Sequence, residues 1–250
     1  MIQQDSRGPV LVVVAHPDDE VLGCGGSIAR WVAAGRPVHV LILADGEASR
    51  GDPKGPSTER SILTRQDAAR RANQILGVGS VNFAGLPDNR LDQESMLEIA
   101  RIVERAVNAV RPETIVTHFH GDLNVDHRVA QQAVAVAARP QPNSRVRDVL
   151  LFETLSSTEW QIAGQASTFL PTWFVDISGH LDTKLRAMEA YRTELRDFPH
   201  PRSLQAIAAL AQLRGATAGV PAAEGFVLGR RIERAEGAVV NTLPGSGTAA

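Results

Sequence analysis

The sequence predicts an α/β fold, a Rossmann-like three-layer sandwich around a mostly parallel central sheet. Strand-like and helix-like segments alternate four times between residues 10 and 138, which is the pattern of parallel strands joined by crossover helices. The first apolar segment, VLVVV at 10–14, is continuous, as in a strand that is buried on both faces. The chain has 250 residues, of which 43% are hydrophobic and 22% charged, so it can bury a full core.

The expected elements follow one another between clear boundaries. Gly35 and Pro37 end the first helix, and Gly77 ends the second. Residues 44–57 are polar and rich in glycine and proline, which indicates a loop. The expected strands are 10–14, 38–43, 80–84, 114–117, 148–152 and 173–176. The expected helices run from about residue 20 to 34 and over 58–76, 95–110, 127–138, 181–196 and 203–214.

The organisation predicts a single domain over residues 1–250. No linker-like segment interrupts the middle of the chain, and no internal repeat is visible. We expect a core at about 10–180, a C-terminal helical elaboration at about 181–235 and a loose tail at 240–250, where the residues are small and polar.

Composition excludes several classes of protein. The net charge of −2 argues against a general nucleic-acid binder, which needs a concentrated basic face. A single cysteine excludes an internal disulfide framework and a cluster of cysteine ligands. The sequence has no apolar segment near the roughly 20 residues of a membrane span, and its start lacks the apolar segment of a secretory signal. We therefore expect a cytoplasmic protein that binds neither nucleic acid nor membrane.

Polar side chains follow two of the expected strands. His16, Asp18 and Asp19 come directly after the first strand, and residues 124–127 (Asn-Val-Asp-His) lie in the segment after the fourth. Ligands of open α/β sheets bind at the carboxyl ends of the strands. Both polar sets are therefore expected at the same edge of the sheet.

These residue types are those of a catalytic metal site. Carboxylates at three consecutive positions, 18–20, repel one another, and a helix N-terminus offsets only ~0.3–1 kcal/mol for each. His16, Asp19 and His127 would supply three ligands to zinc and leave a fourth position for water. Asp18 would stand beside the ion and accept a proton from that water. The alternative is an acidic cluster that only caps the helix, and iron or cobalt would also suit the same donors.

Four segments carry a family resemblance. The segment AHPDDEVLGCGG at 15–26 resembles the signature of the PIG-L/LmbE-like zinc-dependent N-deacetylases, and DLNVDHR at 122–128 is similar to their second metal motif. The segments at 86–92 and 200–215 resemble the family more weakly, and the resemblance spans about residues 10–230. It implies one Zn²⁺ per chain and a homo-oligomer.

The implied reaction is hydrolysis of an N-acetyl group, with release of acetate. The substrate would be an N-acetylglucosamine-type amino sugar in a glycoconjugate, a nucleotide sugar, or an antibiotic or thiol precursor. Hydrolysis of another small amide or ester is an alternative. A nucleotide-binding α/β module is another, although the glycines at 23–26 do not complete the dinucleotide fingerprint.

The resemblance also assigns roles to residues. It implies that His16, Asp19 and His127 are the zinc ligands and that Asp18 is the general base. Asp126 would orient a ligating histidine from outside the metal shell. The residues expected to bind substrate are Arg65, Asp88, Asn89 and His200. Arg65 matches less closely, because the glutamate that often follows three residues later in the family is replaced by Ala68.

The proton donor to the leaving amine has several candidates. Some family members carry a histidine at the position of Asn124, and an amide cannot donate a proton at neutral pH. Either Asp18 returns its proton to the amine, or a nearby histidine serves. His118 and His120 are the nearest candidates, with His200 a distant third, and His118, His120 or Asn124 would donate a hydrogen bond to the oxyanion.

Overall fold

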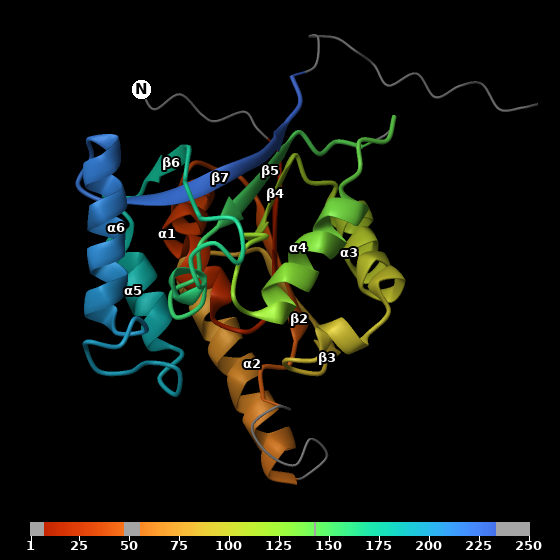
Figure 1. Cartoon of the computed structure of the whole chain (residues 1–250), viewed down its shortest axis with the longest axis horizontal. Coiled ribbons are helices and arrows are strands. Elements are labelled where there is room, and N and C mark those ends of the chain that lie inside the picture. The colour runs from red at the N-terminus through yellow and green to blue at the C-terminus, as the bar shows by residue number, and fades with distance from the viewer. Residues whose placement is uncertain (1–7, 48–55, 143, 234–250) are drawn as a thin grey trace, which may run out of the picture.

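A computed structural model describes residues 8–47, 56–142 and 144–233 of the chain. Its described residues form a seven-stranded mixed sheet in the order β3-β2-β1-β4-β5-β7-β6 (Figure 1). The first five strands are parallel, and β7 runs antiparallel to both of its neighbours. The α/β Rossmann-like prediction is confirmed. The strands are β1 (Val10–Val14), β2 (Val38–Ala44), β3 (Ser80–Leu86), β4 (Thr114–His118), β5 (Asp148–Phe152), β6 (Trp173–Asp176) and β7 (Ala223–Arg231).

Helices cover both faces of the sheet and make the outer two layers. Helices α1, α2, α5 and α6 pack on one face, and α3 and α4 pack on the other (Figure 1). The helices are α1 (Asp19–Ala33), α2 (Pro56–Leu76), α3 (Met96–Val110), α4 (Val125–Ala137), α5 (Leu181–Glu189) and α6 (Leu204–Ala218). Short 3₁₀ turns lie at Leu91–Gln93 (η1) and Thr158–Trp160 (η2).

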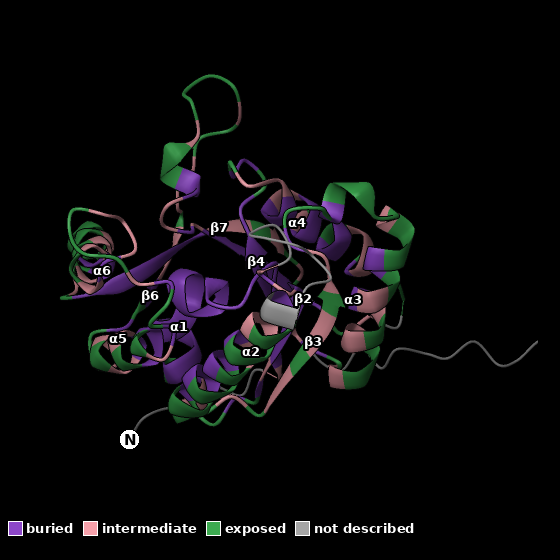
Figure 2. Ribbon diagram, turned by 90° about the horizontal axis from the view of Figure 1, so that it is seen from below, coloured by how far each residue is buried: buried purple, intermediate pink, exposed green. Residues whose placement is uncertain are grey.

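Strand β1 shows why a continuous apolar segment suits this position. Val12 and Val14 point toward the layer of α1 and α2, whereas Leu11 and Val13 point toward α3 and α4. All four side chains are at most 1% exposed, and the central strands are buried along their length (Figure 2). Burial on both faces requires apolar residues at every position.

The structure differs from the sequence-based expectations in two main places. Strand β7, at Ala223–Arg231, was not predicted, and it returns antiparallel between β5 and β6. Helix α5 ends at Glu189 instead of residue 196, and the following residues form turns that direct side chains toward the site. The expected loop at 44–57 lies partly, and the expected tail at 240–250 wholly, outside the described residues.

Among the described residues, no helix combines the length and hydrophobicity of a bilayer-spanning segment. Strands β1 and β4 are neighbours at the centre of the sheet, and from β1 the strand order runs toward β2 and β3 on one side and toward β4 and β5 on the other. Such a reversal leaves a crevice at the carboxyl ends of the strands, where ligands bind in open α/β sheets.

Candidate functional site

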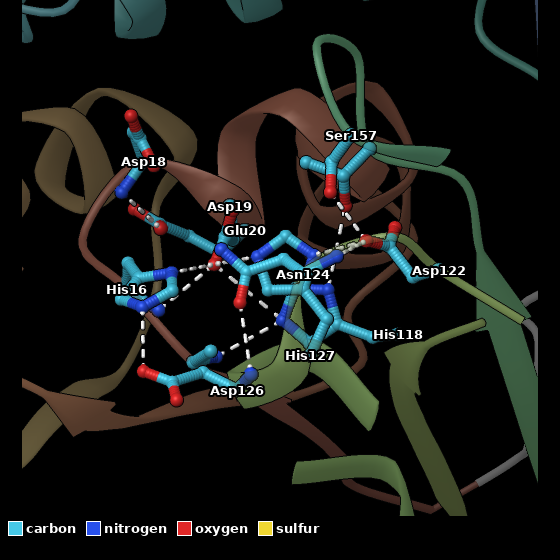
Figure 3. A network of polar contacts seen from close by, with 12 residues as sticks. His16, Asp18, Asp19, Glu20, His118, Asp122, Asn124, Asp126, His127 and Ser157 are labelled. Atoms are coloured by element: carbon cyan, nitrogen blue, oxygen red, sulfur yellow. Dashed lines mark hydrogen bonds and ion pairs between the residues drawn. The ribbon is translucent and has the colours of Figure 1, made fainter. Parts of the chain in front are cut away.

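Three potential metal ligands meet at the carboxyl ends of β1 and β4. His16 Nδ1 and His127 Nε2 lie 3.3 Å and 3.4 Å from the same oxygen, Oδ2 of Asp19. One ligand atom from each residue lies within 4.8 Å of the others. All three side chains are buried, and they point toward one another (Figure 3). The structure thus brings together the two polar sets that lie more than a hundred residues apart in the sequence.

The turn after β1 holds Asp18 in an unusual backbone conformation. Asp18 is the N-cap of α1 with a φ of 118°, and its carbonyl accepts the N–H groups of Val21 and Leu22. Non-glycine residues in sparsely populated backbone regions cost about 1–3 kcal/mol and cluster at functional sites. The Asp18 side chain is buried beside Asp19, and its Oδ1 has no hydrogen-bond partner among the described residues.

Glu20 stabilises this turn by accepting a hydrogen bond from the backbone of the turn. The backbone N–H of Asp18 donates to Glu20 Oε2 at 3.1 Å, and Glu20 Oε1 accepts from the Tyr191 hydroxyl at 2.5 Å and from Asn73 Nδ2 at 2.8 Å. Burial raises the pKa of Glu20 to about 7. Burial also raises the pKa of the Asp18 carboxyl above its usual range, and the charge of Arg202 opposes that rise.

The residues present fit a divalent cation. Asp18, Asp19, Asp122 and Asp126 crowd the site as buried carboxylates, and buried charges need a counter-charge or a metal. Burial alone would lower the pKa of His127, but the carboxylates beside it, first Asp19, raise it to about 9, so the local potential favours positive charge. Asp19 Oδ1 has no hydrogen-bond partner among the described residues. Two imidazoles and a carboxylate are also a donor set of catalytic zinc.

The second ring nitrogen of His16 faces two carboxylates. His16 Nε2 lies 3.0 Å from Asp126 Oδ2 and 3.1 Å from Asp88 Oδ1. Asp126 also accepts the backbone N–H groups of Asn89 and Leu91, at 2.7 and 3.0 Å. This geometry directs Nδ1 of His16 toward Asp19, which is how outer carboxylates orient metal-binding imidazoles. Asp88, which we expected to contact the sugar, is 3% exposed and lies against His16.

Asp122 is a site residue that sequence reasoning does not identify. Its Oδ1 lies 3.1 Å from His127 Nδ1, and its two oxygens accept the hydroxyls of Ser157 and Thr158, the latter at 2.5 Å. Burial alone would raise the pKa of Asp122, but the hydrogen bond with His127 leads the contacts that lower it to about 2. The only signal in the sequence is its place at the start of the segment DLNVDHR.

The candidate donors differ in their surroundings. His118 is fully buried and stacks on His127 at 3.9 Å between ring centroids, and its Nε2 accepts the N–H of Ala15 at 2.9 Å. Burial lowers the pKa of His118 to about 3, so the ring is neutral and a poor proton donor. His120 is exposed and packs against Phe119. Asn124 caps α4 through its carbonyl oxygen.

The expected substrate residues occupy three different environments. Arg65 is 4% exposed and pairs with Glu194 and Glu47, which makes it part of a buried ion network. Asn89 is exposed, with a φ of 53°, and its side chain accepts from Asn124 Nδ2 at 3.4 Å. His200 lies edge-on to Trp160, with 5.9 Å between the ring centroids.

Two further charged residues reach the site from the C-terminal part of the chain. Arg202 Nη1 lies 3.0 Å from Asp18 Oδ2 and 3.1 Å from Glu194 Oε2. Glu194 follows α5, in the turns that replace the expected end of that helix. Sequence reasoning identified neither residue, although Arg202 lies inside one of the weaker matching segments.

The chain is similar to known proteins that are named as deacetylases and to a protein that is named as a hydratase. It is 31% identical over 189 residues to a Bacillus subtilis protein named "Probable N-acetyl-alpha-D-glucosaminyl L-malate deacetylase 2", covering 74% of this chain and 82% of that protein. It is 32% identical over 199 residues to a "4-oxalmesaconate hydratase" of Pseudomonas putida, covering 72% of this chain and 71% of that protein.

The comparison with solved structures agrees with this similarity. The conserved protein TT1542 from Thermus thermophilus superimposes with a TM-score of 0.70 and 26% identity, covering 92% of this chain and 98% of that one. The family model described as "GlcNAc-PI de-N-acetylase" (PIG-L) matches residues 11–138, which contain the three potential ligands, Asp18 and Asp122. By its sequence, its fold and this match, the chain belongs to the PIG-L family.

Proposed function

We propose that this protein is a zinc-dependent hydrolase that removes the N-acetyl group from an N-acetylglucosamine-type amino sugar and releases acetate. The observation that carries the proposal is the meeting of His16, Asp19 and His127 around one point, with the buried carboxylate of Asp18 next to it. The family description and the name of the Bacillus subtilis relative support this reaction.

The metal would be held by His16, Asp19 and His127, one ion per chain. When bound there, zinc would polarise the acetyl carbonyl and lower the pKa of water toward ~7. Asp126 and Asp88 hold the ring of His16 through its Nε2, and Asp122 holds the ring of His127 through its Nδ1. Fixed rings keep their lone pairs aimed at one position, which raises metal affinity.

Asp18 would act as the general base. Its Oδ1 lacks a hydrogen-bond partner among the described residues, so this oxygen is available to take the proton of the attacking water. A base must lie within hydrogen-bond reach of the proton that it abstracts. The same carboxylic acid would then return the proton to the departing amine, because the ring of His118 is buried against His127 and its Nε2 already accepts the N–H of Ala15.

Asn124 would serve as a hydrogen-bond donor at the open side of the site. Its carbonyl oxygen is occupied by the N–H of Asp126 at 2.8 Å, which fixes the amide and leaves its Nδ2 directed toward Asn89. Asn89 and His200 are the exposed or half-buried residues that we assign to substrate binding. Donors placed in advance of the reaction stabilise a developing oxyanion without reorganisation.

The test is a measurement of acetate release. Purified protein with zinc is incubated with N-acetylglucosamine, its β-1,4-linked disaccharide and N-acetylglucosaminyl malate, and acetate and free amine are quantified. We expect at least one of these sugars to lose its acetyl group. The hydratase named among the relatives makes 4-oxalmesaconate the necessary comparison substrate. Hydration of that compound without acetate release from any sugar would contradict the proposal.

A second test concerns the base. Asp18→Asn should keep its zinc and lose acetate release by about 10²–10⁴-fold, the usual contribution of a positioned base. Asp92→Asn, in η1, changes an exposed carboxylate and is the matched control. Activity of the Asp18→Asn variant equal to that of the wild type would exclude Asp18 as the base.

We propose further that the chain works as one deacetylase domain, in the cytoplasm and as a homo-oligomer. Strand β7 supports a single domain, because it joins the C-terminal part of the described chain to the same sheet as β1 and β4. Denaturant unfolding in one cooperative transition, and a mass in solution above that of one chain, are the expected results.

A further inference from the structure

An arginine from the C-terminal part of the chain lies against the proposed base. Arg202 Nη1 donates to Asp18 Oδ2 at 3.0 Å, although the two residues are separated by 184 positions in sequence. The Asp18 side chain is 1% exposed, and that of Arg202 is 21% exposed. Arg202 lies outside the part of the chain that the family model matches, residues 11–138.

The guanidinium of Arg202 is held from several directions. Its Nε donates to Ser156 Oγ at 2.7 Å, and its Nη1 also donates to Glu194 Oε2 at 3.1 Å. The other oxygen of Glu194 pairs with Arg65, which donates from α2 to the carbonyl of Pro17 at 3.3 Å. Contacts with Asp18, Ser156 and Glu194 therefore fix the position of the guanidinium, which matters because a free arginine side chain has many rotamers.

The contact divides the two oxygens of Asp18 into different roles. Oδ2 is occupied by Arg202, whereas Oδ1 is buried and has no hydrogen-bond partner among the described residues. Rotation of the carboxylate about its terminal bond would exchange the two oxygens, and such torsions are broad for aspartate. A fixed charge-assisted hydrogen bond on Oδ2 opposes that rotation.

We propose that Arg202 is a positioning residue for the base: it holds Oδ2 of Asp18 so that Oδ1 faces the reacting water. The inference rests on the proposed function, in which Asp18 is the base. In that step the proton of water passes to Oδ1, and Oδ2 keeps its hydrogen bond to Arg202. Glu194 and Ser156 in turn position Arg202, so the C-terminal part of the chain completes a site whose proposed metal ligands follow β1 and β4.

The alternative is that Arg202 only stabilises its own loop. Both roles predict some loss of activity in Arg202→Ala, so the test needs readouts that separate them. Arg196→Ala is the matched control, because Arg196 is an exposed arginine of the same segment whose guanidinium donates to the backbone carbonyls of Thr193 and Leu195, and because the variant keeps the backbone N–H that donates to the carbonyl of Arg202. Steady-state kinetics are measured on the wild type, both variants and Arg202→Lys, together with bound zinc and thermal unfolding.

Arg202→Ala should lose about 10²-fold in kcat, the cost of a misplaced catalytic group. Its KM should stay within about twofold, since an effect confined to the base leaves substrate binding unchanged. Bound zinc should equal that of the wild type, and added guanidinium ion, well below denaturing concentrations, should restore part of kcat. Arg202→Lys should retain more kcat than Arg202→Ala, and Arg196→Ala should behave as the wild type.

The double variant provides the decisive comparison. If Arg202 acts through Asp18, adding Arg202→Ala to Asp18→Asn should cause no further loss of kcat, because residues that act as a unit are not additive. Three results would overturn the inference while leaving the deacetylase proposal intact: a further loss of kcat in the double variant, an effect of Arg202→Ala mainly on KM, or no loss of kcat in Arg202→Ala. A wild-type protein that releases no acetate from any sugar would overturn both.

Discussion

Replacing Asp122 by asparagine removes the negative charge that holds His127 in its ligand orientation. Asp122 Oδ1 lies 3.1 Å from His127 Nδ1, and the carboxylate also accepts the N–H of Asn124 at 2.9 Å and the hydroxyls of Ser157 and Thr158. The N–H of Asn124 and the two hydroxyls are hydrogen-bond donors, and a protonated His127 adds a charge. An amide in the same place keeps one acceptor oxygen and turns an NH₂ group toward a hydroxyl that now has to reorient.

The size of the effect follows from this geometry. Asp122 belongs neither to the group His16, Asp19 and His127 nor to the second group that could hold a metal ion, His16, Asp88 and Asp126, so the proposed ligand set survives the change. Loss of a carboxylate that orients a ligating histidine costs about 10–100-fold in metal affinity. We therefore expect the Kd for zinc to rise by about 10–100-fold, which corresponds to about 1.4–2.7 kcal/mol of binding free energy.

The assay is a competitive zinc titration against a chelating dye, with wild type and variant at the same pH. The matched control is Asp148→Asn. Asp148 is also a buried carboxylate with a hydrogen-bonded partner, Arg231 Nε at 2.8 Å, but it begins β5 at the amino end of the strand. Its zinc Kd should equal that of the wild type. A Kd for Asp122→Asn within twofold of the wild type would refute the idea that Asp122 orients a metal ligand.

Three further predictions concern the packing of α1. A Cβ at Gly23 would lie 2.1 Å from a ring carbon of Phe152, so Gly23→Ala should destabilise the fold by about 3 kcal/mol in urea unfolding, and an unchanged midpoint would contradict the packing. Lys184→Met removes the charged partner of the buried carboxylate of Glu224, which then keeps the N–H groups of Gly26 and Ser27, and should cost about 3–5 kcal/mol in urea unfolding; a loss below about 1 kcal/mol would contradict the role of this ion pair. Cys24 is 0% exposed and burial raises its thiol pKa, so iodoacetamide at mildly alkaline pH should label it only after denaturation, and rapid labelling of native protein would disprove its burial.

Local sequence patterns predict the parallel part of the sheet well. Strand β1 can be predicted from the sequence because burial on both faces requires an unbroken apolar segment. Strand β7 carries two glycines and charged ends, and its place depends on strands β5 and β6, which lie far away in sequence. Residues 190–196 favour a helix locally, but the chain turns there and buries Tyr191 and Glu194 in polar contacts that no local pattern reveals.

The candidate site also has a part that the sequence predicts and a part that depends on tertiary packing. His16, Asp19 and His127 were predictable because strand order alone places the carboxyl ends of β1 and β4 side by side. The role of Arg65 in substrate binding stays a prediction, whereas its pairing with Glu194 could not be predicted, because it depends on the turns after α5. The contacts of Asp122 and Arg202 likewise depend on tertiary packing, since each residue pairs with partners from distant segments.

The amount of bound zinc shows whether His16, Asp19 and His127 hold a metal ion. Protein loaded with excess Zn²⁺ and dialysed is analysed for bound metal, for the wild type and for His127→Ala, which removes one of the three proposed ligands. We expect about one zinc per chain in the wild type, the stoichiometry of a three-ligand catalytic site, and much less bound zinc in the variant. A wild-type protein without zinc, or a variant that retains as much zinc as the wild type, would contradict this expectation.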